Sequence, residues 1–216
     1  MAFTHLPETD LKFDLGKQDF GEPYCAGVMG GASKVGDRVQ VAVSSFAKFT
    51  ETGPLVVVID VMFWWVGMRF QGYGNPQIQD PKYVLSHFDK ILQQYRDGIV
   101  GLVQLVKDGC FQADRSCVVV GKANHNPSYE EGTVELKLHL AMREVLRGIF
   151  DGSDGKYFFD WYAVANQAKQ DGKWDMLDWL HQGPLSSQVE TVAFEAFTRE
   201  TLPEGFSVNL GGNPVP

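Results

Sequence analysis

An aspartate and a histidine stand three residues apart near the end of the chain, in Asp178-Trp-Leu-His181. A carboxylate at that spacing can orient an imidazole, which can then take a proton from a nucleophile supplied elsewhere in the fold. The pattern predicts acyl-transfer chemistry with His181 as the general base and Asp178 as its orienting carboxylate. The alternative is that Asp178 caps a turn and His181 is a surface residue at the entrance of a helix.

The nucleophile for such a base is predicted at Ser33. This serine follows two glycines at the end of the apolar run 24–29, where a strand is expected to enter a tight turn. A serine at that transition can be exposed above a parallel sheet, and the Gly30 or Gly31 amide can donate to the oxyanion. The alternative is an ordinary glycine-rich turn, and Ser44 and Ser45 are further candidates for the nucleophile.

Three more residues are expected where a substrate would be contacted. Asp60 ends the apolar run 55–59, which predicts a position at the carboxyl edge of the sheet, where open α/β sheets bind ligands. Trp64 follows in the same stretch and could line a pocket, although core packing is the commoner use of tryptophan. His125 lies in the polar loop 121–128 and could contact substrate, although a loop histidine is more often solvated.

The composition is that of a globular protein and narrows the classes of partner. The 216 residues are 44% hydrophobic and 21% charged, with a net charge of −8, which suits one domain with a substantial core. The acidic balance and the lack of a Lys/Arg cluster argue against nucleic acid and anionic membranes. The N-terminus lacks the apolar region of a signal peptide, which favours a cytoplasmic protein, and the apolar run 55–68 is too short to span a bilayer.

The cysteines and glycines argue against several cofactor sites. Neither the three cysteines, Cys25, Cys110 and Cys117, nor the histidines have the spacing of a metal site, so no metal is expected. Cys110 and Cys117 flank a short turn and could pair in an oxidising compartment, whereas buried free thiols are commoner inside cells. A nucleotide or flavin binder of the same architecture is a third hypothesis, but no phosphate-binding loop motif supports it, and no organic cofactor is expected.

Hydrophobic periodicity predicts the elements that position these residues. The expected strands are 24–29, 39–43, 55–59, 117–120 and 157–159. The expected amphipathic helices are 82–106, 133–150 and 188–202. Strands that alternate with helices imply right-handed crossovers and a mainly parallel sheet. The prediction is a single three-layer α/β domain over 23–202, with 1–22 as a surface segment and 203–216 as a loose tail.

This order of elements resembles that of the second half of the SGNH, or GDSL-type, hydrolases and their PC-esterase relatives. The similarity covers roughly residues 55–202 and rests on four features of the chain. These are Ile59-Asp60-Val-Met-Phe-Trp64-Trp65 at a strand end, Val118-Val-Val-Gly121 with its polar loop, Phe-Phe-Asp-Trp-Tyr at 158–162, and Asp178-x-x-His181 before the last helix. The resemblance implies a three-layer α/β/α sandwich with a flavodoxin-like sheet, and an acyl-serine mechanism that needs no cofactor.

The chain departs from that family in two blocks. It has no Gly-Asp-Ser, for which Gly31-Ala32-Ser33 is the nearest equivalent, and no Gly-x-Asn-Asp around Asp60. The resemblance implies a serine esterase or O-acyl hydrolase that acts on a small ester, such as an acetylated carbohydrate. The departures support a second hypothesis, in which a catalytically silent member of the fold binds a protein partner through the sheet edge or an acidic surface.

Overall fold

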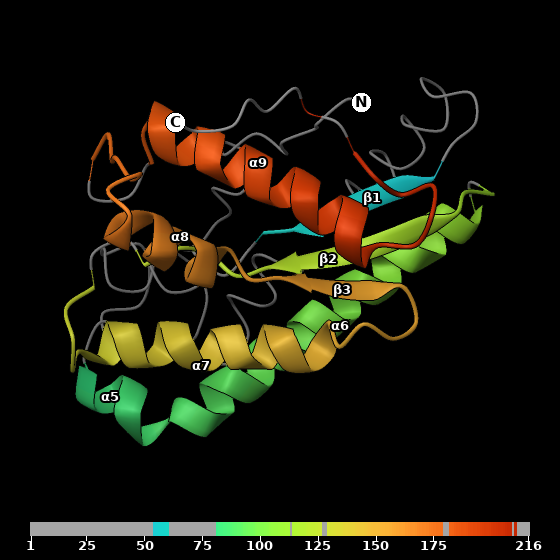
Figure 1. Cartoon of the computed structure of the whole chain (residues 1–216). Helices are drawn as coiled ribbons and strands as arrows, with labels where there is room; N and C mark the ends of the chain where they lie inside the picture. Colours follow the sequence, from blue (N-terminus) through green and yellow to red (C-terminus); the bar gives the residue numbers. More distant parts are fainter. Residues whose placement is uncertain are drawn as a thin grey trace. The chain divides into compact units, whose positions relative to one another are not determined.

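The structure is a computed structural model that describes residues 54–60, 81–112, 114–126, 129–178, 182–208 and 210. These residues form strands and helices in the order shown in Figure 1. They belong to two compact units, one with 81–117 and the other with 54–60 and 118–210. The predicted strands 24–29 and 39–43 lie outside the described residues.

Two helices make up most of the described part of the first unit, α5 (Pro81–Ser86) and α6 (Phe88–Gln112). They confirm the predicted helix, and a proline at the first helical position removes no helical hydrogen bond because that N–H has no partner inside the helix. The helix α6 continues through Gly98 and Gly101 and beyond the predicted end. Its buried side chains recur every three or four residues, at Ile91, Tyr95, Ile99, Leu102, Val103, Val106 and Cys110.

The sheet contains β1 (Leu55–Ile59), β2 (Cys117–Lys122) and β3 (Lys156–Phe159), in the order β1-β2-β3. The strands β2 and β3 are parallel, with Val120 opposite Tyr157 and Lys122 opposite Phe159. Three consecutive valines of β2 are buried, as expected for a strand that is covered on both faces. The three strands confirm the predictions for this region and the α/β class.

The described part of the second unit also contains three helices, α7 (Val134–Ile149), α8 (Trp161–Gln170) and α9 (Pro184–Thr201). Thr133 caps α7, because its hydroxyl accepts a hydrogen bond from the Leu136 N–H at 3.3 Å. The helices α7 and α9 confirm two predictions, with α9 beginning earlier than expected at Pro184. No helix in the described ranges is both long and apolar enough to cross a membrane.

The helix α8 was not predicted, because the aromatic run 158–162 continues the pattern of the predicted strand 157–159. The Asp160 carboxylate accepts from the Ala163 N–H at 3.3 Å and so begins a helix directly after β3. Asp160 also accepts two hydrogen bonds from Arg143, at 2.9 and 2.5 Å, and one from Arg147 at 2.9 Å. Burial raises the pKa of Asp160, but the two arginines outweigh this effect and hold the pKa below its ordinary value.

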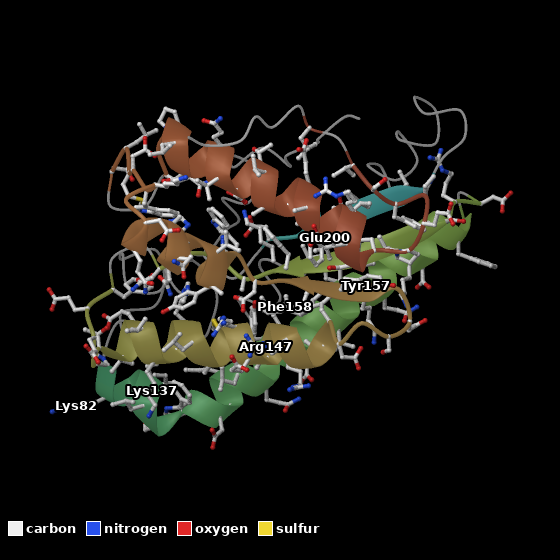
Figure 2. All side chains as sticks on the ribbon, in the orientation of Figure 1. Lys82, Lys137, Arg147, Tyr157, Phe158 and Glu200 are labelled. Carbon is white, nitrogen blue, oxygen red and sulfur yellow. The ribbon has the colours of Figure 1, made fainter. Side chains whose placement is uncertain are left out.

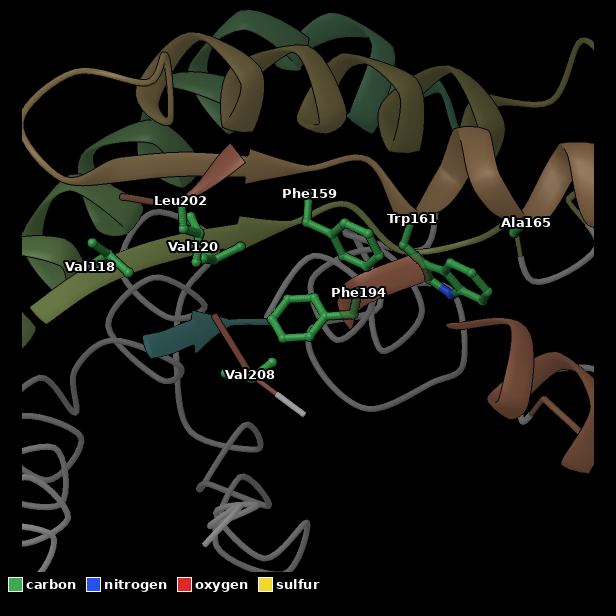
Figure 3. Packing of buried hydrophobic residues seen from close by; sticks show 8 residues of the cluster. All are labelled: Val118, Val120, Phe159, Trp161, Ala165, Phe194, Leu202 and Val208. Atoms are coloured by element: carbon green, nitrogen blue, oxygen red, sulfur yellow. The ribbon is translucent and has the colours of Figure 1, made fainter. Parts of the chain in front are cut away.

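Alternate residues of β2 and β3 contact different helices. Phe150, at the end of α7, packs on Gly121, and the Arg147 guanidinium lies 5.4 Å from the centre of the Phe158 ring (Figure 2). The neighbouring positions on the strands join a core that includes α9 and the segment after it (Figure 3). The members of this core are Val118, Val120, Phe159, Trp161, Ala165, Phe194, Leu202 and Val208.

Replacing Gly121 by alanine is expected to destabilise the fold by about 2 kcal/mol, because the added methyl group would overlap the Phe150 ring. The matched control is Gly101→Ala on α6, where the methyl group meets no atom within 4 Å and alanine favours the helix by about 1 kcal/mol. Urea unfolding followed by circular dichroism measures both changes. Wild-type stability of Gly121→Ala would contradict the packing of β2 on Phe150.

Candidate functional site

Three charged side chains meet at the carboxyl ends of β1 and β2. Asp60 directly follows β1, Lys122 ends β2, and Glu190 comes from α9. The Lys122 ammonium group donates to the Asp60 carboxylate at 2.9 Å and also pairs with Glu190. Burial alone would lower the pKa of Lys122, but the two carboxylates outweigh it and raise that pKa. Lys122 is therefore a cation at neutral pH, held between two anions at the edge where parallel sheets bind ligands.

Glu190 joins this cluster to the segment that carries the predicted acid-base pair. The Gln182 side-chain amide donates to the Glu190 carboxylate, and the Gln182 backbone forms an antiparallel bridge with Met176. Asp178 lies between the two bridge partners and is exposed. His181 directly precedes Gln182 in the sequence but lies outside the described residues. Contacts thus run from Asp60 through Lys122 and Glu190 to the residue next to His181.

Asp175 fixes the other side of this segment to the start of α9. Its carboxylate accepts from the backbone N–H groups of Ser186, at 2.8 Å, and Leu185, at 3.3 Å. The buried Ser186 hydroxyl accepts from the Asp175 N–H at 2.8 Å and donates to the Asp175 carbonyl at 2.6 Å. The Ser186 N–H lowers the pKa of Asp175, which is therefore an anion at the positive end of a helix.

Gly183 is required where the segment enters α9. Its N–H donates to the Asp175 carbonyl at 2.9 Å, and a methyl group on Gly183 would overlap the Asp175 carboxylate. The two ends of the Asp178 segment are therefore fixed independently, one through Asp175 and the other through Gln182. Asp175 therefore holds this segment against the start of α9.

A second cluster follows β2 and contains the predicted substrate residue His125. This side chain is buried, contrary to the expectation for a loop histidine, and its ring lies 5.2 Å from that of Trp174. Trp174 in turn lies 5.9 Å from Trp161. Lys169 sits over Trp174 at 4.8 Å and donates to the Asn126 carbonyl at 3.2 Å. The polar loop is therefore packed against α8 and the segment after it.

His139, on α7, is the buried centre of this region and was missed by the sequence analysis. Its Nε2 donates to the Asn124 carbonyl at 3.1 Å, and Tyr129 and Tyr162 lie 5.9 and 5.6 Å away, ring centre to ring centre. Burial lowers the pKa of His139 to about 4, so the imidazole is neutral at pH 7. Its spacing from Met142, three residues, was the signal that placed it on the apolar face of the helix.

The structure brings only some of the predicted site residues together. It brings Asp60 into the cluster that is linked to the Asp178 segment, and it places His125 three residues after Lys122 in a separate packed loop. Gly31, Ser33 and Trp64 lie outside the described residues. Within the described ranges, no group of three or more His, Cys, Asp or Glu side chains could hold a metal ion. Lys122 and Glu190, which the sequence analysis did not single out, connect the parts of the site.

Comparison of the chain with protein-family models, with curated proteins and with solved structures gives no match.

Proposed function

We propose that the chain is an SGNH-like serine esterase or O-acyl hydrolase that acts on a small ester, with acetylated carbohydrates as the first substrates to test. His181 is the general base, Asp178 its orienting carboxylate and Ser33 the nucleophile. The Gly31 amide donates to the oxyanion, and Asp60, Trp64 and His125 contact the substrate.

The proposal rests on one observation: contacts hold the segment that contains Asp178 at the carboxyl edge of the sheet. These contacts are the hydrogen bond from Gln182 to Glu190 and the ion pairs of Glu190 and Asp60 with Lys122. An acid-base pair works on a ligand at this edge only if its loop is held there, because proton transfer needs groups within about 3 Å. The position of Gln182 supports a role for His181 at the same edge.

The packing also supports the finer fold prediction, a three-layer α/β/α sandwich with a flavodoxin-like sheet. On one side, Arg147 of α7 contacts Phe158, and Phe150 at the end of α7 contacts Gly121. On the other side, Phe194 of α9 contacts Phe159, with 5.1 Å between the ring centres. Successive strand residues point to opposite faces. These contacts support our proposal of one helix layer on each face of the parallel sheet.

The proposed reaction proceeds in two halves. The Ser33 hydroxyl attacks the ester carbonyl while His181 takes its proton, and Asp178 stabilises the imidazolium that forms. Donors fixed around the oxyanion lower the barrier by roughly 3 kcal/mol each. The alcohol leaves with the proton from His181, and water activated by the same imidazole then hydrolyses the acyl-serine.

Hydrolysis of p-nitrophenyl acetate tests the proposal. We expect His181→Ala and Ser33→Ala to lower kcat/KM by roughly 10³-fold or more, and Asp178→Asn by at least roughly 10²-fold. Asp171→Asn is the control, since this exposed acid follows α8 and accepts a hydrogen bond only from Gln167 among the interactions of the described residues. Equal activity of all four variants and the wild type would exclude the proposed triad.

The absence of Gly-Asp-Ser and Gly-x-Asn-Asp from the sequence favours one alternative function, a silent member of the fold that binds a protein partner. This alternative predicts no ester hydrolysis above background by the folded wild-type protein. It also predicts that the ion cluster at the sheet edge contributes to binding or stability only.

A further inference from the structure

Two cysteines of the first unit are held in contact. Cys110 lies in the last turn of α6 and is 1% exposed, whereas Cys117 begins β2 and is partly exposed. Both are free thiols, and their side chains are hydrogen-bonded to each other. One buried and one partly exposed cysteine therefore form a pair within a short stretch of chain.

Backbone hydrogen bonds stabilise the turn between the two cysteines in the reduced protein. The Arg115 N–H donates to the Cys110 carbonyl at 2.9 Å, and the Asp114 N–H donates to the Phe111 carbonyl at 3.0 Å. Asp114 adopts the left-handed conformation, with φ of 51°, which aspartate tolerates better than most residues. The turn that joins the two cysteines is thus held by backbone hydrogen bonds and does not depend on a disulfide.

The pair is electrostatically asymmetric. The hydrogen bond from the Cys110 thiol lowers the pKa of Cys117, and the Lys107 cation lowers it further. The same hydrogen bond, with burial, raises the pKa of Cys110. Because the thiolate is the reactive form of cysteine, the accessible Cys117 is the nucleophile and the buried Cys110 is poised to react second.

We propose that Cys110 and Cys117 form a reversible oxidation site whose co-reactant is a small hydroperoxide. This site is independent of the proposed esterase activity. The Cys117 thiolate attacks a peroxide oxygen, so that an S–O bond forms, the O–O bond breaks and the released hydroxide takes up a proton. The Cys110 sulfur then attacks the sulfenic acid, so that an S–S bond forms and the S–O bond breaks. Its thiol proton leaves with the hydroxyl group as water. The sulfur pair loses two electrons and the peroxide is reduced.

The test exposes the reduced full-length protein to a stoichiometric amount of hydrogen peroxide. The remaining thiols are then blocked with N-ethylmaleimide and the peptides are mapped by mass spectrometry. We expect a Cys110–Cys117 disulfide that dithiothreitol reverses, formed at least roughly tenfold faster than in the urea-unfolded chain. Formation no faster than in the unfolded chain, or pairing of either residue with Cys25 instead, would overturn the proposal.

Two single variants assign the roles within the pair. With Cys110→Ser, we expect Cys117 to stop at the sulfenic acid, which dimedone traps, and its alkylation by iodoacetamide to require a higher pH. With Cys117→Ser, we expect Cys110 to stay unmodified. Oxidation of Cys110 in the absence of Cys117, at the wild-type rate, would reverse the assignment and contradict the proposed order of steps.

Discussion

Replacing Lys122 by methionine is expected to destabilise the protein by about 3 kcal/mol. The change leaves the Asp60 and Glu190 carboxylates facing each other without the cation that lies between them. Lys122 and Glu190 are largely buried, with side chains 15% and 19% exposed, whereas Asp60 is 32% exposed. Solvent thus screens only part of the repulsion. Urea unfolding at pH 7 measures the change, and ester hydrolysis by the same variant is expected to fall because the Asp178 segment loses its support.

Two further variants distinguish the stability contributed by the cluster of Asp60, Lys122 and Glu190 from a general effect of losing a lysine. The double variant Lys122→Met/Glu190→Gln is expected to recover part of the lost stability, because it removes one of the two anions and keeps a partner for Gln182. Lys169→Met, at an exposed lysine that stacks on Trp174, is expected to cost less than about 1 kcal/mol. Equal losses for Lys122→Met and Lys169→Met would contradict the role of the cluster.

Acidification from pH 7 to pH 5 is expected to cost the protein about 2 kcal/mol of stability through His139. Burial, together with the nearby His125, Arg143 and Lys169, lowers the folded-state pKa of this residue from 6.5 to about 4. Between these values the unfolded chain binds the proton and the folded chain does not. The contribution of neutral His139 to the stability of the folded protein is therefore fully present above pH 6.5 and is lost as the pH falls toward 4. Urea unfolding at both pH values measures the difference.

The control for this pH effect is His139→Gln. Glutamine keeps an N–H donor for the Asn124 carbonyl, which His139 Nε2 contacts at 3.1 Å, but it does not titrate. We expect the variant to be less stable than the wild type at pH 7, with most of the loss between pH 7 and pH 5 removed. An unchanged loss in His139→Gln would assign the acid sensitivity to another group.

The sequence was sufficient to predict most elements of the described fold, because their apolar patterns are long and regular. The run 55–59 and the valines of β2 are bounded by turn residues, and α7 and α9 repeat their buried positions with helical spacing. The helix α8 was missed because Trp161 and Tyr162 extend the aromatic pattern of β3 past Asp160. The capping bond of Asp160 depends on backbone geometry that an aromatic run does not predict.

The candidate site was only partly predictable. Asp60 and Lys122 each follow a buried run, and neighbouring parallel strands bring such ends together, so their ion pair was within reach of the sequence. The choice of Glu190 as the second partner depends on which face of α9 turns toward the sheet. The link from Glu190 to Gln182 is likewise a tertiary contact between segments whose individual patterns carry no such signal.

Labelling with a fluorophosphonate probe, mapped by peptide mass spectrometry, tests the central proposal most directly. The comparison uses the wild type and His181→Ala, both shown by circular dichroism to be folded. We expect an adduct on Ser33 that disappears in His181→Ala, which would establish a serine activated by the predicted base. An adduct on another serine that depends on His181 would support the esterase activity but assign the nucleophile to that serine. No adduct on the folded wild type would contradict the esterase activity and favour the alternative, a catalytically silent member of the fold that binds a protein partner.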